Sequence, residues 1–141
     1  MKKNNKKIDA AIIVIGNEIL SGRTQDVNVV NLSKWLNSLG VILKEVRIIP
    51  DVENVIIKTV NEMRKKFQYI FTTGGIGPTH DDITSKSISK ALNLKYCYHP
   101  EAYKLLEKYY EKGKFNIGRK KMAKIPKTAS LIYNPSSAAP G

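Results

Sequence analysis

Short apolar runs alternate with segments of helical periodicity through the first hundred residues, and this alternation constrains the fold more than any other feature. The apolar runs are β-branched and bounded by glycine or proline, as buried strands are. The predicted strands are 9–16, 41–49 and 68–73. The predicted helices are 26–39, 51–66 and 81–92, with Leu92 on the inner face of the last. Such an order predicts right-handed crossovers and a mostly parallel sheet with helices on both faces, an α/β fold.

The second part of the chain has a weaker pattern. We expect a short strand at 94–98 and a helix that begins at Pro100, where proline suits the first helical turn. Residues 113–127 carry little apolar periodicity and predict an irregular, exposed segment. One more short strand is expected within 130–141, SLIYNPSSAAPG. We interpret 1–8 as a basic disordered tail and 9–141 as one domain, C-terminally truncated because it stops abruptly at a turn.

A formal net charge of +12 raises the question of a nucleic-acid partner. The lysines are dispersed, however, and only residues 119–127 resemble a patch, so we expect attraction of anionic small molecules instead. One cysteine, Cys97, excludes an internal disulfide and suits a reducing compartment. No run reaches the roughly 20 apolar residues that a membrane helix needs. We therefore expect a cytoplasmic protein with no membrane partner.

The turn after the third strand carries the main functional signal, FTTGGIGPTHDDIT at 71–84. Glycines let backbone N–H groups approach an anion, and the following helix adds unpaired N–H groups at its start. Asp81 and Asp82 should repel a phosphate unless a divalent cation bridges them, and Mg²⁺ commonly takes one or two carboxylates plus phosphate oxygens. The pattern predicts a metal-bound phosphate or pyrophosphate. The alternative is structural: a tight turn followed by a helix that Thr79 or an aspartate caps.

The motif TTGGIGPTHDDIT resembles the signature of the molybdopterin-binding family of molybdenum-cofactor biosynthesis. IGNEILSGRTQDVN at 15–28 and NPSSAAPG at 134–141 make the chain similar to one branch of that family. The branch is typified by competence/damage-inducible protein A and includes the molybdopterin-binding-like domain of FAD synthases. The resemblance implies a three-layer α/β/α sandwich. It also implies a molybdopterin or an adenine dinucleotide as ligand, and, for an enzyme, metal-dependent pyrophosphatase activity on molecules such as ADP-ribose or FAD.

The resemblance also implies a set of site residues. The implied catalytic residues are Asp82 and Asp51, and the implied metal ligands are Asp82 and Asp81. The implied ligand-binding residues are Gly74, Gly75, Gly77, Pro78, Thr79, Thr84, Glu18, Asp26, Asn28, Ala139, Pro140 and Gly141. Structural alternatives stay open: Asp51 and Asp26 can each cap a helix, and Glu18 can be an ordinary loop carboxylate.

Two departures from the family pattern bear on specificity. Asn17 stands where an aspartate is common, and Ser137 with Ala138 replaces Gly-Thr in the final loop. The other function classes are a binding or regulatory domain without catalysis and a nucleic-acid-binding protein. We expect a phosphorylated small molecule as partner, and a homo-oligomer. From its position we expect Asp81 to cap the helix and Asp82 to serve the ligand.

Overall fold

A strand buried on both faces forms the centre of the fold. The computed structural model describes residues 8–141, so the predicted disordered tail lies outside the described residues except for Ile8. Strand β1 (Ile8–Ile15) lies between β2 (Val41–Ile49) and β3 (Tyr69–Thr73) and is parallel to both. From Ala10 to Ile15 its side chains are at most 2% exposed. The predicted parallel sheet is confirmed, with β1 at its centre and β3, which leads into the glycine turn, at one edge.

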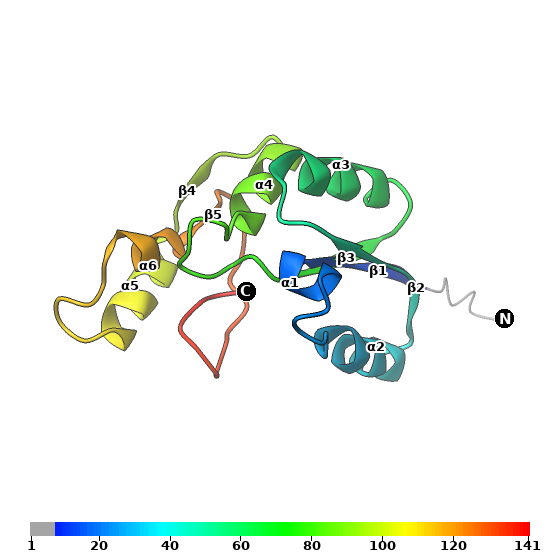
Figure 1. The fold of residues 1–141 in the computed structure, drawn as a ribbon, viewed down its shortest axis with the longest axis horizontal. Coiled ribbons are helices and arrows are strands. Elements are labelled where there is room, and N and C mark those ends of the chain that lie inside the picture. The colour runs from blue at the N-terminus through cyan, green and yellow to red at the C-terminus, as the bar shows by residue number, and fades with distance from the viewer. Residues whose placement is uncertain (1–7) are drawn as a thin grey trace, which may run out of the picture.

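Helices cover both faces of this sheet, as Figure 1 shows. Helix α2 (Asn28–Ser38) lies on one face, where the Trp35 ring meets Phe71 of β3 edge-on at 6.4 Å. Helices α3 (Glu53–Met63) and α4 (Thr84–Ala91) lie on the other face. A core cluster joins Ile13 of β1 to Ile56 and Met63 of α3, all three fully buried. The predicted three-layer α/β/α arrangement is therefore confirmed.

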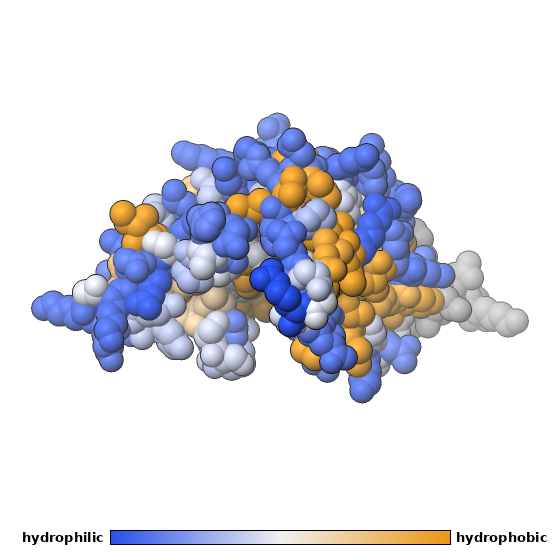
Figure 2. Space-filling model, in the orientation of Figure 1, coloured by the Kyte–Doolittle hydropathy of each residue, from blue (hydrophilic) through white to orange (hydrophobic). Residues whose placement is uncertain are grey.

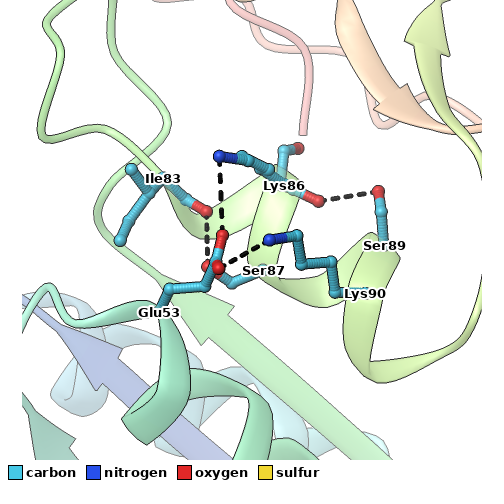
Figure 3. Close-up of polar contacts among 7 residues, drawn as sticks. Glu53, Ile83, Lys86, Ser87, Ser89 and Lys90 are labelled. Atoms are coloured by element: carbon cyan, nitrogen blue, oxygen red, sulfur yellow. Dashed lines mark hydrogen bonds and ion pairs between the residues drawn. The ribbon is translucent and has the colours of Figure 1, made fainter.

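An ion-pair cluster holds α3 against α4 (Figure 3). Glu53, in the first turn of α3, accepts from Lys90 Nζ at 2.6 Å and lies 3.6 Å from Lys86 Nζ. The two lysines stand one turn apart on α4, so both face the same carboxylate. The ammonium of Lys90 is the main reason that the pKa of Glu53 is lowered, although partial burial of the carboxyl opposes it. The cluster fixes the position of α4 behind the turn that follows β3.

A second, smaller unit follows α4 and occupies one end of the molecule in Figure 1. Strand β4 (Tyr96–Tyr98) pairs antiparallel with β5 (Lys124–Pro126), and helices α5 (Pro100–Tyr109) and α6 (Ile117–Lys121) lie between them in the chain. Its own core contains Ala102, Leu106, Met122 and Ala123. We call residues 96–126 the arm.

Several expectations for the second half of the chain are wrong. Residues 113–127 are not irregular, because they contain α6 and β5. No strand forms within 130–141, where Ile132 and Gly141 instead exchange two backbone hydrogen bonds. Leu92 is 38% exposed rather than inward-facing. The arm depends on pairing between residues nearly 30 positions apart, which local periodicity does not register.

The face of the molecule in Figure 2 is mainly hydrophilic, as expected from the lysine content. Exposed apolar side chains gather on the side where β2 lies, between α2 and α3, and include Val46 and Ile48 of β2. Within residues 8–141, none of the helices combines the length and the apolar character that a bilayer-spanning segment requires.

We expect Glu53→Gln to lower the free energy of unfolding at neutral pH by up to about 1 kcal/mol, since the pair is only partly shielded from solvent. The folded pKa of Glu53 lies below its ordinary value. The stabilisation is therefore present above the unfolded pKa and is lost as pH falls through the folded pKa. Urea unfolding at neutral and acidic pH measures this, with Glu107→Gln, exposed on α5, as the control. A deficit that is unchanged at acidic pH would contradict the ion-pair explanation.

Candidate functional site

The three parallel strands end at the same edge of the sheet, and the segments that follow them meet there. Asn17 begins helix α1 (Asn17–Leu20) two residues after β1, Asp51 comes two residues after β2, and Gly74 directly follows β3. In parallel sheets this carboxyl edge is where ligands bind. We call residues 74–82 the glycine loop.

Asp51 connects these segments. Its Oδ2 accepts a hydrogen bond from the backbone N–H of Asn17 at 2.9 Å. Its Oδ1 lies 3.5 Å from the position that a Cβ on Gly75 would occupy. The N-cap residue of α3 is Val52, and no side chain caps the helix with a hydrogen bond. The alternative in which Asp51 caps this helix is therefore wrong. The half-buried carboxylate of Asp51 lies instead between the ends of β1 and β3.

The loop glycines are required by backbone geometry. Gly74 and Gly75 have φ of +89° and +64°, in the region that L-residues rarely adopt. A side chain on Gly74 would overlap the carbonyl oxygen of Ile15, and one on Gly75 would overlap Thr84 Oγ1. Thr84 is buried, with 2% of its surface exposed. Its hydroxyl donates to the carbonyl oxygen of Gly74 at 2.8 Å, and its backbone N–H donates to the carbonyl oxygen of Gly75 at 3.0 Å. Thr84 therefore fixes the first two residues of the glycine loop to the start of α4.

Asp81 and Asp82 both face the hydroxyl of Thr79. Thr79 Oγ1 lies 2.5 Å from Asp81 Oδ1 and 2.5 Å from Asp82 Oδ2, so its single proton serves one carboxylate at a time. Asp82 Oδ2 also accepts from the Thr79 backbone N–H at 2.8 Å. The Thr79 hydroxyl is the main cause of a lowered pKa at Asp81. The carboxylates thus lie side by side at the mouth of the loop.

The expected division of work between the two aspartates differs from the observed contacts. Helix α4 begins at Thr84, not at 81, and has no side-chain cap, so the expectation that Asp81 caps it is wrong. Asp82 is the residue that holds the backbone of the loop, through Thr79. The adjacent pair Asp81-Asp82 does not reveal this in the sequence, because the outcome depends on where the helix begins.

A narrow cleft runs beside the glycine loop and is closed on its far side by the arm. We call it the loop cleft. It is lined by Gly75, Gly77, Asp82, Ser85, Tyr96, Lys121, Lys124 and Pro140, among others. A Cβ on Gly77 would lie 2.7 Å from Asp82 Oδ2, so this glycine lets the carboxylate approach the loop. Sequence reasoning missed Tyr96, Lys121 and Lys124, although it noted the basic patch at 119–127.

The C-terminal motif joins the same region. Pro140 lines the loop cleft, and Asn134 Nδ2 donates to the Ala139 carbonyl at 3.0 Å. Gly141 pairs with Ile132 through the two backbone bonds noted above. Of the predicted residues in this motif, Pro140 is therefore the one that the structure brings into the cleft.

The remaining predicted residues lie on the segments after β1. Glu18, on α1, folds back so that its carboxylate oxygens lie 2.8 Å from where a Cβ on Gly16 would be. Asp26 Oδ1 accepts from the Val29 N–H at 2.8 Å, which caps the start of α2. Asn28 is the exposed first residue of that helix. Glu18 thus lies over the end of β1, whereas the contacts of Asp26 are with its own helix.

The side chains that could bind a divalent cation are the two carboxylates of the glycine loop, Asp81 and Asp82. Among residues 8–141, no group of three or more His, Cys, Asp or Glu side chains is close enough to enclose a metal. Asp81 and Asp82 nevertheless direct oxygens at one point, the Thr79 hydroxyl. Two carboxylates fit the habit of Mg²⁺, which completes its shell with water and ligand phosphate oxygens. The residues fit a cation that arrives with a phosphate.

We expect Gly75→Ala to destabilise the protein more than Gly40→Ala. Both positions have positive φ, which costs an L-residue about 1–2 kcal/mol, but only the side chain at 75 would overlap Thr84 Oγ1. Urea unfolding of the two variants measures the additional loss in free energy of unfolding at position 75. In a Thr84→Ala background, the difference between Gly75→Ala and Gly40→Ala should become smaller. Equal losses at positions 75 and 40 in the unsubstituted background would contradict the close contact between the loop and Thr84.

Comparison with known proteins agrees with this geometry. The family described as the probable molybdopterin binding domain matches residues 11–141. A curated protein of Sulfurisphaera tokodaii is 38% identical over 135 residues, which are 94% of this chain and 51% of that protein. One from Archaeoglobus fulgidus is 35% identical over 129 residues, 92% of this chain and 55% of that protein. The chain thus spans about half the length of these relatives.

Solved structures extend the comparison. CinA of Thermoplasma acidophilum, described as a protein with unknown function, superposes with a TM-score of 0.89 at 30% identity, over 96% of this chain and 80% of that one. The tungsten cofactor synthesizing protein MoaB of Pyrococcus furiosus superposes with a TM-score of 0.55 at 22% identity, over 92% and 76%, which shows a shared fold. The match over residues 11–141, on a chain with this glycine loop, shows that the protein belongs to the molybdopterin-binding domain family.

Proposed function

We propose that this domain binds a phosphorylated small molecule, a pterin or an adenine dinucleotide, on the glycine loop. The observation that supports this most is the convergence of all three strand ends around Asp51 and Gly75. At Gly74 and Gly75 the loop backbone carries no side chain of its own, which lets an anion approach its amides. Behind it, α4 begins without a side-chain cap, and Ser85 of its first turn lines the loop cleft. Uncapped N–H groups at a helix start favour an anion.

Family membership supports the pterin alternative. The Pyrococcus furiosus relative is named for synthesis of the tungsten cofactor, and one from Thermus thermophilus with a TM-score of 0.55 is named as a molybdopterin biosynthesis enzyme. Those likenesses are at 22% and 18% identity, so they support a shared fold and pocket position more than a shared ligand. The more similar CinA structure carries no assigned function.

We further propose hydrolysis of a pyrophosphate bond, as in ADP-ribose. The paired carboxylates of Asp81 and Asp82 support this, because they make the mouth of the loop unfavourable for a bare phosphate and favourable for a cation–phosphate pair. A bound divalent ion would polarise the phosphorus and lower the pKa of a water molecule. The loop amides would hold the phosphates, Asp82 with Asp81 would hold the ion, and Asp51 would orient the groups between β1 and β3.

Hydrolysis of ADP-ribose to AMP and ribose 5-phosphate by the full-length protein, with Mg²⁺ or Mn²⁺, tests this function. We expect Asp82→Asn to lower kcat/KM by about a hundredfold or more, because a metal ligand is lost. Glu107→Gln removes the same charge from exposed α5 and should leave the rate unchanged. Chelation of the metal should stop turnover by the unsubstituted protein and by Glu107→Gln.

Two results would change the conclusion. Full activity of Asp82→Asn would contradict the catalytic assignment. Binding of ADP-ribose without turnover would support a binding or regulatory domain and reject the enzyme. Thermal unfolding of each variant is needed beside the kinetics, because Asp82 also holds the Thr79 backbone and its replacement should lower stability to some extent.

A further inference from the structure

The arm supplies two positive charges to a cleft that otherwise carries a carboxylate. Helix α6 and β5 together hold Arg119, Lys120, Lys121 and Lys124. Only Lys121 and Lys124 of these four line the loop cleft, and both are half-buried. The other two face aromatic rings of the arm: Arg119 lies 4.3 Å from the centre of the Tyr110 ring and Lys120 lies 5.6 Å from that of Phe115. Lys121 and Lys124 are therefore the two of these four cations that can act on a ligand in the loop cleft.

Lys121 is fixed to the glycine loop itself. Its Nζ donates a hydrogen bond to the carbonyl oxygen of Thr79. Thr79 lies in the chain between the loop glycines and the two aspartates. The backbone of α6 also touches the loop, since a Cβ on Gly118 would lie 2.8 Å from the Pro78 carbonyl oxygen. A lysine ammonium has three N–H donors, so the bond to Thr79 leaves two for a ligand.

Lys124 reaches the cleft from the neighbouring strand. Its Nζ lies 4.8 Å from the centre of the Tyr98 ring and 5.9 Å from that of Tyr96, which also lines the cleft. Contact with the ring faces holds the ammonium on the cleft side of the antiparallel pair without using any of its hydrogen-bond donors. Among residues 8–141, Lys124 forms no salt bridge with a carboxylate. A charged donor in this state beside the glycine loop favours an additional anion.

We propose that Lys121 and Lys124 bind the second phosphate of a diphosphate ligand, whose first phosphate occupies the glycine loop. This assignment rests on the proposed function and narrows it: a diphosphate ligand is favoured over a monophosphorylated pterin. The two lysines lie across the loop cleft from the glycine loop, where their charges offset that of Asp82. The cleft has a volume of about 20 Å³ in this structure, so the arm must move outward for a phosphate to enter between its walls.

Calorimetric titration of AMP and of a methylene-bridged ADP-ribose analogue that cannot be hydrolysed tests this, with the full-length protein, Mg²⁺ present and one fixed salt concentration. We expect Lys124→Met to weaken binding of the ADP-ribose analogue by about tenfold, because the hydrogen bond from its ammonium to the second phosphate is lost. The double variant Lys121→Met/Lys124→Met loses both such bonds and should weaken binding further. AMP, which lacks the second phosphate, should keep its affinity within about threefold for Lys124→Met. Lys124→Arg should restore most of the affinity for the ADP-ribose analogue.

The matched control is Lys127→Met, which removes one charge from an exposed position just beyond β5. It should bind both ligands as the unsubstituted protein does. Because Lys124 has no bond to the loop, its single variant keeps the Lys121–Thr79 contact and isolates ligand binding from loop stability. Thermal unfolding checks this.

The outcomes separate the two proposals. Unchanged affinity for the ADP-ribose analogue in Lys124→Met, or an equal loss for the analogue and AMP, would overturn the second-phosphate assignment while leaving the glycine loop as a phosphate site. Failure of the unsubstituted protein to bind either molecule would overturn the proposed function and this inference together.

Discussion

The burial of β1 from Ala10 to Ile15 is the constraint on which the rest of the structure depends. A strand with no exposed face must be covered by helices on both sides and paired along both edges. Parallel pairing with β2 and β3 then brings the three strand ends to one edge. Asp51, Asn17 and the glycine loop meet there because of this topology. The site is therefore a consequence of how the apolar segment from Ala10 to Ile15 is removed from water.

The sheet and the position of the glycine loop could be predicted because each depends on local signals. The β-branched runs at 9–16 and 41–49 specify strands, and the helix-spaced apolar residues between them specify the covering layer. The glycines of TTGGIG mark a turn that no side chain can enter, and their φ values bear this out at Gly74 and Gly75. A parallel sheet then places that turn at its ligand-binding edge.

The parts that could not be predicted depend on contacts between distant segments. Asp51 has the position of a helix cap in the sequence, yet its carboxylate bonds to Asn17, 34 residues away. Asp81 likewise has a cap position, but the helix begins three residues later and the carboxylate turns to Thr79. The lysines of the arm reach the loop cleft only because β4 and β5 pair, and that pairing has no signature in local periodicity.

The arm has a core of its own, and this core is smaller than the one between the sheet and its helices. Four buried side chains support the arm, whereas eight support the cluster between the sheet and α3. A unit with fewer buried contacts opens at a lower free energy than the whole domain. Local opening of the arm would separate Gly118 from Pro78 and uncover the loop while the sheet stays folded. Access to the cleft would then be governed by a sub-global unfolding equilibrium, and a ligand that touches both walls would slow amide exchange throughout the arm.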